Sequence, residues 1–196
     1  MSEKTKNKIK EAFAELVLEK GFDSITVSSL SRKAQINRGT FYLHYLDKYD
    51  LMEQLEEDLL AGFKKHFEGE RETIELDMEP VGAALLAAKI IMNALHYAMD
   101  NYLYIRALIS EKSDWRFIEK FKILLRDHLR KKEDYGKVIQ HNYDGIPLDY
   151  AEEILLSRAI SILLVWLRKD AKESPEEITK LIIQVANIPF IPPIKL

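Results

Sequence analysis

Apolar residues recur at helical spacing along nearly the whole chain, and this periodicity constrains the fold more than any other feature of the sequence. In the first segment Ile9, Phe13 and Leu16 fall on one face, as one side of a helix with 3.6 residues per turn requires. Gly21 follows the last apolar turn, at a position where glycine commonly ends a helix. Comparable patterns fill the later segments, so the sequence predicts an all-α protein.

Three residues that favour helix N-termini follow one another in the next part of the chain. Thr26 precedes a short apolar pattern, and Asn37 can cap a second short helix over 38–45. Asp47 can cap a third helix, which is long and reaches about Phe67. Two short helices joined by a turn of three or four residues form a helix-turn-helix, so the sequence predicts an N-terminal three-helix domain of this kind.

The second short helix has one apolar side and one polar side. We expect Phe41 and Tyr45 to be buried. The outward side or the helix start is left to Arg38, Gly39, Thr40, Tyr42 and His44. A helix of this kind fits the major groove of DNA with its first residues toward the base edges. Glycine weakens a helix interior, but at the start of a recognition helix Gly39 would let the backbone approach DNA closely.

The ordered residues of this segment resemble the N-terminal pattern of the TetR/AcrR family of bacterial regulators over about 6–52. The matching residues are Gly21-Phe22, Thr26-Val27, Ala34, Ile36-Asn37, Arg38-Gly39-Thr40-Phe41-Tyr42, His44-Tyr45 and Asp47-Lys48. Two positions depart from the pattern. Gln35 stands where glycine is usual, and His44-Tyr45-Leu46 replaces an aromatic pair that ends in phenylalanine.

The resemblance implies roles for individual side chains. Phosphate contacts are implied for Thr26, Tyr42, His44 and Lys48. Arg38 could pair with guanine, and the methyl group of Thr40 could touch that of thymine. Ser28 and Ser29 could add phosphate contacts or serve only as caps. Three of these side chains also have a plainer interpretation, in which Tyr42 is half-buried core and His44 and Lys48 are ordinary surface residues.

The remainder of the chain is also helical in pattern, after a polar stretch over 68–79 that we interpret as a linker. Two helix starts have capping-box spacing, Asp149 with Glu152 and Ser174 with Glu177. The first of these helices is apolar on nearly all sides over 160–167, so one side needs a partner, which a second copy of the chain could supply. We therefore expect a DNA-binding domain over 1–50, a dimerisation and effector domain over 51–196, and a homodimer formed through about 149–186.

Composition and charge bound the function further. The chain has 196 residues, 47% hydrophobic and 31% charged, a net charge of −3 and no cysteine. Residues 1–50 carry nine Lys or Arg and seven Asp or Glu, so this part is at +2 and the rest at −5. Without cysteine there is no disulfide or thiolate zinc site. We find no membrane-span pattern and no signal peptide, and expect a cytoplasmic protein without metal or cofactor.

The expected function is that of a homodimeric regulator on a two-fold DNA operator. The family's common mode implies a repressor that a small effector releases. Aromatic residues such as Tyr97 and Trp166 could line a pocket, but aromatic residues at helical spacing are usually core. A ligand-independent regulator, or an activator that acts through a partner protein, stays open, as does a helical adaptor that binds no DNA. An enzyme is not expected, because no histidine has a glutamate three residues before it and no phosphate-loop or nucleophile motif is present.

Overall fold

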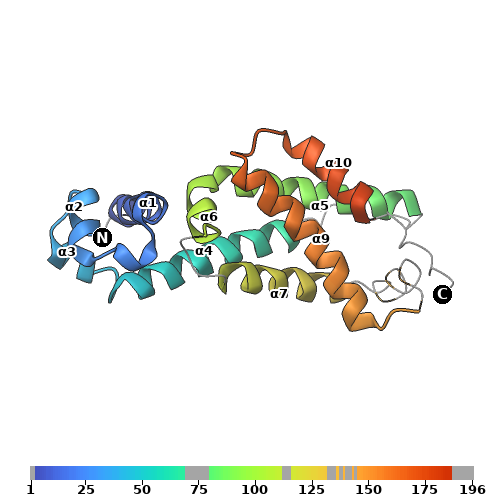
Figure 1. Ribbon diagram of the computed structural model, residues 1–196, viewed down its shortest axis with the longest axis horizontal. Helices are drawn as coiled ribbons and strands as arrows, with labels where there is room; N and C mark the ends of the chain where they lie inside the picture. The colour runs from blue at the N-terminus through green and yellow to red at the C-terminus, as the bar shows by residue number, and fades with distance from the viewer. Residues whose placement is uncertain are drawn as a thin grey trace. The chain divides into compact units, whose positions relative to one another are not determined.

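The fold was obtained as a computed structural model, which describes residues 3–68, 80–111, 116–131, 136, 139, 143 and 145–186. Within these residues the regular structure is helical with no strand, which confirms the all-α prediction. The elements in Figure 1 are α1 (Glu3–Lys20), η1 (Phe22–Ser24), α2 (Val27–Lys33), α3 (Arg38–Tyr42), α4 (Lys48–Glu68), α5 (Pro80–Asp100), α6 (Tyr102–Leu108), α7 (Arg116–Arg130), α9 (Leu148–Arg168) and α10 (Pro175–Ala186). The predicted linker over 68–79 begins one residue too early, because Glu68 is the last residue of α4, and its residues 69–79 lie outside the described part of the chain. Within the described residues, every helix is too short or too polar to span a bilayer.

The chain divides into two compact units, each with its own packing. Unit 1 comprises Met1–Phe63 and Ala98–Lys120, and unit 2 comprises Lys64–Tyr97 and Phe121–Leu196. The helices α4, α5 and α7 each contribute residues to both units.

In unit 1, α1 is the helix on which its neighbours assemble. It packs against α6 and α2, and α2 packs against α3. Phe13 of α1, Leu30 of α2 and Phe41 of α3 are fully buried. Gly21 ends α1 at a φ of 82° and donates its N–H to the carbonyl of Val17, so glycine supplies the left-handed residue that ends this helix.

The prediction of a helix over 38–45 is too long, because α3 ends at Tyr42. The amides of His44 and Tyr45 both donate to the carbonyl of Phe41. The amide of Leu46 donates instead to the carboxylate of Asp50. The chain thereby turns into α4, whose first amides bond Asp47 as predicted. Tyr45 is nevertheless buried as expected, at 2% exposed.

The turn between α2 and α3 contains a strained residue. Gln35 adopts a φ of 56°, and the amide of Ile36 donates to the carbonyl of Ser31 at 2.9 Å. A side chain in this left-handed region costs about 1–2 kcal/mol. Glycine avoids that cost, which explains why the TetR/AcrR pattern usually has glycine at this position.

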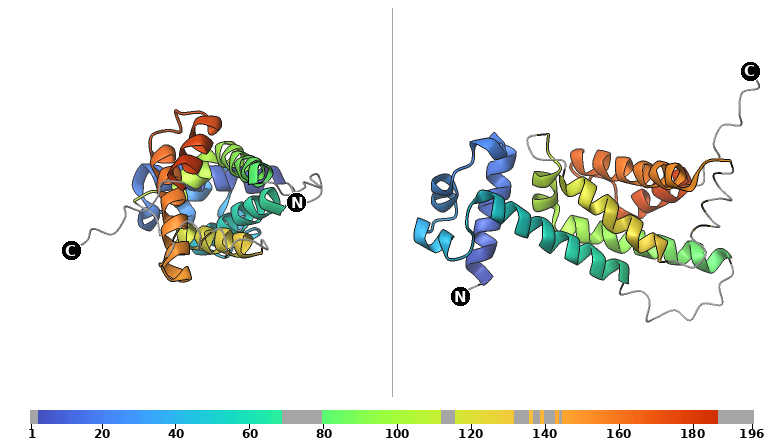
Figure 2. Two further views of the ribbon diagram at one scale, coloured as in Figure 1. Left: turned by 90° about the vertical axis from the view of Figure 1, so that its right-hand side faces the viewer. Right: turned by 90° about the horizontal axis from the view of Figure 1, so that it is seen from below.

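Unit 2 contains α9 and α10 side by side (Figure 2). The indole of Trp166 in α9 is 1% exposed, and its Nε1 donates to the carbonyl of Glu173 in the connecting loop. The predicted capping box at α10 is present, because the Ser174 amide bonds Glu177 and the Glu177 amide bonds Ser174. Trp166 is therefore a core residue that fastens the α9–α10 connection.

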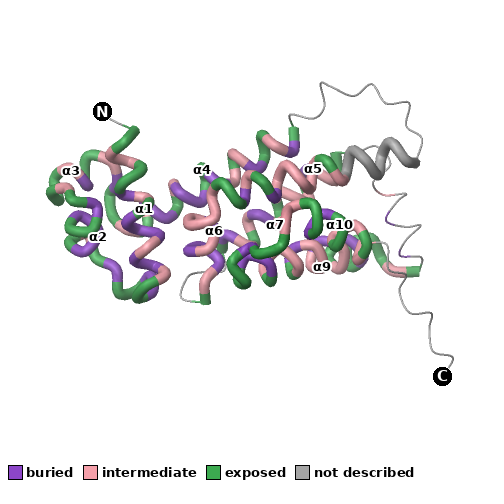
Figure 3. The backbone as a smooth tube through the Cα atoms, turned by 90° about the horizontal axis from the view of Figure 1, so that it is seen from above, coloured by how far each residue is buried: buried purple, intermediate pink, exposed green. Residues whose placement is uncertain are grey.

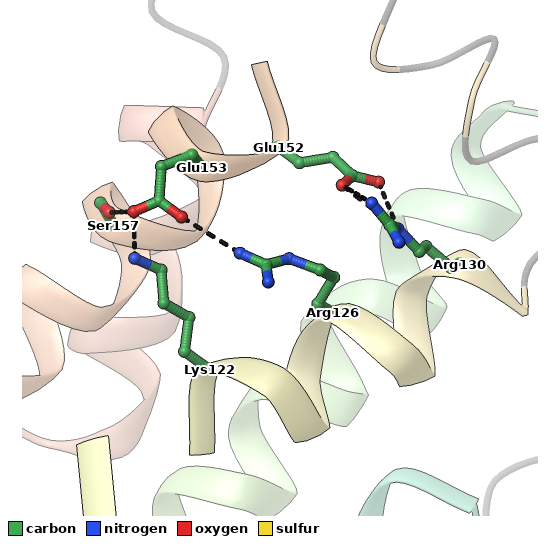
Figure 4. Close-up of polar contacts among 6 residues, drawn as sticks. All are labelled: Lys122, Arg126, Arg130, Glu152, Glu153 and Ser157. Carbon is green, nitrogen blue, oxygen red and sulfur yellow. Dashed lines mark hydrogen bonds and ion pairs between the residues drawn. The ribbon is translucent and has the colours of Figure 1, made fainter. Parts of the chain in front are cut away.

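The capping box predicted from Asp149 and Glu152 is wrong. Here α9 begins at Leu148, and its N-cap residue Pro147 makes no side-chain capping bond. The carboxylate of Glu152, 2% exposed, accepts from Nε of Arg130 at 2.9 Å instead (Figure 4). A buried carboxylate needs a charged partner more than a helix end needs one more cap.

A second ion-pair group joins α7 to α9 beside that pair. The carboxylate of Glu153 accepts from Lys122, from Arg126 at 3.1 Å and from the Ser157 hydroxyl at 3.1 Å (Figure 4). The Lys122 ammonium holds the pKa of the Glu153 carboxyl below its usual value. Two neighbouring α9 carboxylates thus fix the register of α7 against α9.

We expect Tyr45→Phe to stabilise the protein. Among the described residues the Tyr45 hydroxyl is buried without a hydrogen-bond partner, a situation that costs about 1–3 kcal/mol. Burial raises the pKa of Tyr45 from 10.0 to about 12, so between pH 10 and 12 the unfolded chain loses this proton while the native chain keeps it. In that pH range the free energy of unfolding falls by up to about 1.4 kcal/mol per pH unit. The Tyr45→Phe variant has no hydroxyl at this position and should lack this part of the pH dependence. Urea unfolding at pH 8 and pH 11 measures both effects.

Tyr143→Phe is the matched control for that experiment. Its hydroxyl is also on a buried ring, 3% exposed, but it accepts from Nη1 of Arg158 at 3.3 Å. Removing a bonded hydroxyl lowers stability by about 0.5–1.5 kcal/mol. If the two substitutions changed the free energy of unfolding equally, the Tyr45 hydroxyl could not be the one without a hydrogen-bond partner.

We expect Gln35→Gly to raise the free energy of unfolding by about 1 kcal/mol. The substitution removes the strain of the left-handed conformation, about 1–2 kcal/mol. It also costs about 0.5–1 kcal/mol, because glycine loses more conformational entropy on folding. Gln35→Ala keeps its Cβ and should leave stability unchanged. Urea unfolding compares the three proteins, and a destabilising Gln35→Gly would contradict the turn geometry.

Candidate nucleic-acid interface

The predicted site residues lie on α2, α3 and the ends that flank them. Thr26 caps α2 as expected. Its Oγ1 accepts from the Ser29 amide at 3.1 Å, and the Ser29 Oγ accepts from the Thr26 amide at 3.0 Å. Ser29 is buried in this capping box. Of the two serines, Ser29 is therefore the one whose hydroxyl belongs to the capping box, and Ser28 keeps an exposed hydroxyl.

The start of α3 is fixed by Asn37. Its Oδ1 accepts from the amide of Thr40 at 2.7 Å and from the Thr40 hydroxyl at 3.0 Å. Because that hydroxyl proton is used by the cap, Thr40 retains its methyl group and the acceptor lone pairs of Oγ1 for an outside contact. A Cβ added to Gly39 would lie 3.2 Å from the same Oδ1. Glycine there keeps this cap uncrowded, in addition to leaving the backbone open.

Arg38 and Ser28 are brought together across the two helices. Nη2 of Arg38 donates to Oγ of Ser28 at 2.8 Å, and both residues are exposed. The bond uses one of the five N–H groups of the guanidinium. It orients Arg38 and leaves donors for a further partner.

Tyr42 and His44 follow on the same segment. Tyr42 is 57% exposed, and its ring meets the edge of buried Phe41 at a centroid distance of 5.7 Å. His44 is half-buried beside the ring of Tyr45. The interpretation of Tyr42 as half-buried core is therefore wrong, because more than half of its surface is exposed to solvent.

Lys48 is held by the chain itself. Its ammonium donates to the carbonyls of Phe22 and Asp23, at 3.1 Å each, and lies 4.6 Å from the centroid of the Phe22 ring. An ammonium has three N–H donors, so these two bonds leave one donor. Lys48 is thus neither buried nor a freely moving surface lysine.

The positive charge of this region is less available than the sequence indicates. Lys33 pairs with Glu15 at 2.9 Å and Glu19 at 2.8 Å, and hydrogen bonds to these carboxylates raise its pKa to about 12. Its charge is therefore offset by α1. No group of three His, Cys, Asp or Glu residues in the described part of the chain could hold a metal ion.

Three exposed apolar residues lie in this region, and the sequence pattern assigns none of them a contact with DNA. Leu43 is 68% exposed, Leu46 80% and Tyr49 55%. Figure 3 shows exposed positions, in green, along α2 and α3. Helical spacing from Gly39 could have identified Leu43, since it lies four residues further on.

Comparisons with known proteins agree with this geometry. Residues 9–55 match the model of bacterial regulatory proteins of the TetR family, and residues 87–188 match a transcriptional regulator C-terminal region of the same group. The uncharacterized regulator YxbF of Bacillus subtilis is 24% identical over 95% of this chain. The chain spans 46% of the length of that curated relative.

Solved structures show the same fold. A TetR transcriptional regulator from Streptococcus agalactiae is 27% identical, with a TM-score of 0.62 and 93% of each chain covered. FadR from Bacillus subtilis, solved with stearoyl-CoA, is 16% identical with a TM-score of 0.64, over 93% of this chain and 98% of that one. Members of the matched family are transcription factors without enzymatic activity, in agreement with the expectation from sequence. An N-terminal helix-turn-helix and a matched C-terminal region together place this chain in the TetR family of bacterial regulatory proteins.

Proposed function

We propose that this chain is a sequence-specific DNA-binding transcriptional regulator that reads duplex DNA with α3. One observation carries the proposal. In a TetR-family chain, α3 is anchored by fully buried Phe41 while Arg38, Gly39 and Tyr42 are exposed. A short helix with one fixed face and one open face is suited to entering the major groove. A regulator of transcription acts at the chromosome, so we place it in the cytoplasm.

Base recognition falls to the first residues of α3. Arg38 retains free N–H donors that suit the O6 and N7 acceptors of guanine, and Thr40 retains its methyl group. Gly39 allows the helix to come close to the base edges. The bond from Arg38 to Ser28 gives Ser28 a positioning role in addition to any phosphate contact.

Phosphate contacts fall to residues around α3. Thr26, Tyr42, His44 and Lys48 supply hydroxyl, imidazole and ammonium donors. The Thr26 hydroxyl accepts from the Ser29 amide and donates to the Ser29 Oγ at 3.4 Å, a long bond that a phosphate oxygen can replace. Lys48 keeps one N–H, and its anchoring on η1 means that little side-chain freedom is lost on binding. Contacts of this kind orient the protein without reading sequence.

We further propose a homodimer through about 149–186. Ile160, Trp166 and Leu167 are buried within the chain. Val165 in α9 is 50% exposed and Leu181 in α10 is 42% exposed, so each of the two helices leaves apolar surface for a partner to cover. A two-fold dimer would present two copies of α3 to a two-fold operator.

Repression with release by a small effector is the mode we propose. FadR of Bacillus subtilis, which has the same fold, binds stearoyl-CoA, and NalD of Pseudomonas aeruginosa is a repressor of an efflux pump. An effector that favours a different spacing of the two α3 copies would weaken operator binding. The mode is contradicted if operator affinity stays constant across a broad panel of metabolites. A constitutive regulator or an activator with a protein partner would then be the better assignment.

Selection of bound sequences from a random DNA pool tests the function directly. We expect a two-fold site and salt-sensitive binding. Arg38→Ala should lose about 1–3 kcal/mol of preference for one base pair per half-site, measured by gel shift on matched operators. Lys172→Ala removes an exposed cation from the loop after α9 and should bind as the original protein does. A pool without enrichment would support the helical adaptor instead.

The dimer proposal has its own test. Val165→Asp places a charge at an apolar contact, so the dimer should dissociate at least about tenfold more readily in sedimentation equilibrium. Ile123→Asp changes an apolar residue of α7 that is equally exposed, at 52%, outside the proposed interface. If both variants or neither lost the dimer, the assignment of 149–186 would be incorrect.

A further inference from the structure

Gly39 and Leu43 lie on the side of α3 that is opposite buried Phe41. Each residue of a helix turns by about 100°, so positions two before and two after Phe41 lie nearly opposite it. The Leu43 amide donates to the Gly39 carbonyl at 3.1 Å, which shows that the helical turn continues through Leu43. Phe41 is fully buried, whereas Gly39 is exposed and Leu43 is 68% exposed.

An apolar side chain therefore stands on the face that enters the groove. Leu43 lies one turn beyond Gly39 and Thr40, the residues at the start of that face. Gly39 carries no side chain that would hold the helix away from DNA. Leu46 differs, although it is 80% exposed, because its amide is bonded to Asp50 in the turn that starts α4.

We infer that Leu43 is a specificity-determining residue that contacts the C5-methyl group of a thymine in each half-site. This rests on the proposed function, in which α3 reads the major groove. Leucine has no donor or acceptor, so it cannot bond a phosphate or a polar base edge. The apolar group that base pairs display in the major groove is the thymine methyl. The methyl group of Thr40, on the same face, extends this apolar surface.

Replacing thymine by deoxyuridine removes that methyl and leaves every hydrogen-bonding group of the base pair in place. We would scan the thymines of the selected operator in this way, substituting both half-sites together, and measure affinities with the full-length chain. At one thymine position the original protein should lose about fourfold in affinity per half-site, the factor expected for one methyl group removed from apolar contact. Leu43→Ala should lose nothing at that position.

Two variants complete the design. Leu43→Met keeps an apolar side chain of similar volume. Unlike Leu43→Ala, this variant should again lose affinity when the thymine methyl is removed. Leu46→Ala removes an exposed leucine three residues away and should keep the full fourfold loss. All three substitutions are at exposed positions, so their melting temperatures should match that of the original protein.

The outcomes separate this inference from the function it rests on. Recovery of an operator in which no thymine shows a methyl effect dependent on Leu43 overturns the inference and leaves the regulator intact. An unchanged methyl effect in Leu43→Ala, with a uniform loss of affinity, would assign Leu43 to the sugar-phosphate backbone and also overturns it. Failure to recover any operator removes the proposed function itself.

Discussion

Burial of Phe41 is the interaction on which the functional surface depends. A helix as short as α3 is not stable alone, because too few of its backbone bonds close within it. The Phe41 ring, fully buried and in edge contact with Tyr42, fixes the rotation of α3 about its axis. Once that rotation is fixed, the directions of Arg38, Thr40 and Leu43 follow from helix geometry alone.

The capping bonds define this surface as strictly as the core does. Thr26 starts α2 and Asn37 starts α3, and each accepts a backbone N–H that would otherwise be unpaired. The same bonds limit what the side chains can still offer. Asn37 uses the Thr40 hydroxyl proton, Ser28 takes one donor of Arg38, and the η1 carbonyls take two donors of Lys48. The site is consequently preorganised, and its free groups are fewer than its residue types indicate.

Much of this could be predicted because the relevant signals are local. Periodicity located the helices, and the caps at Thr26, Asn37, Asp47 and Ser174 were predicted from residue type and spacing. The same reasoning failed for Asp149 and Glu152. Arg130 is 22 residues from Glu152 in the chain, and no local pattern reveals that a buried carboxylate has a charged partner so far away.

The sequence by itself determined the helical class, the helix-turn-helix, the burial of Phe41 and Tyr45 and the resemblance to the TetR family, because each depends on residues within a few turns of one another. Only the tertiary structure decided which charges are already paired, as with Lys33 between Glu15 and Glu19. It also decided that α3 ends at Tyr42 and that Leu43, the residue that follows, is 68% exposed. Exposure and pairing depend on contacts between distant segments, and those contacts exist only once the chain has folded.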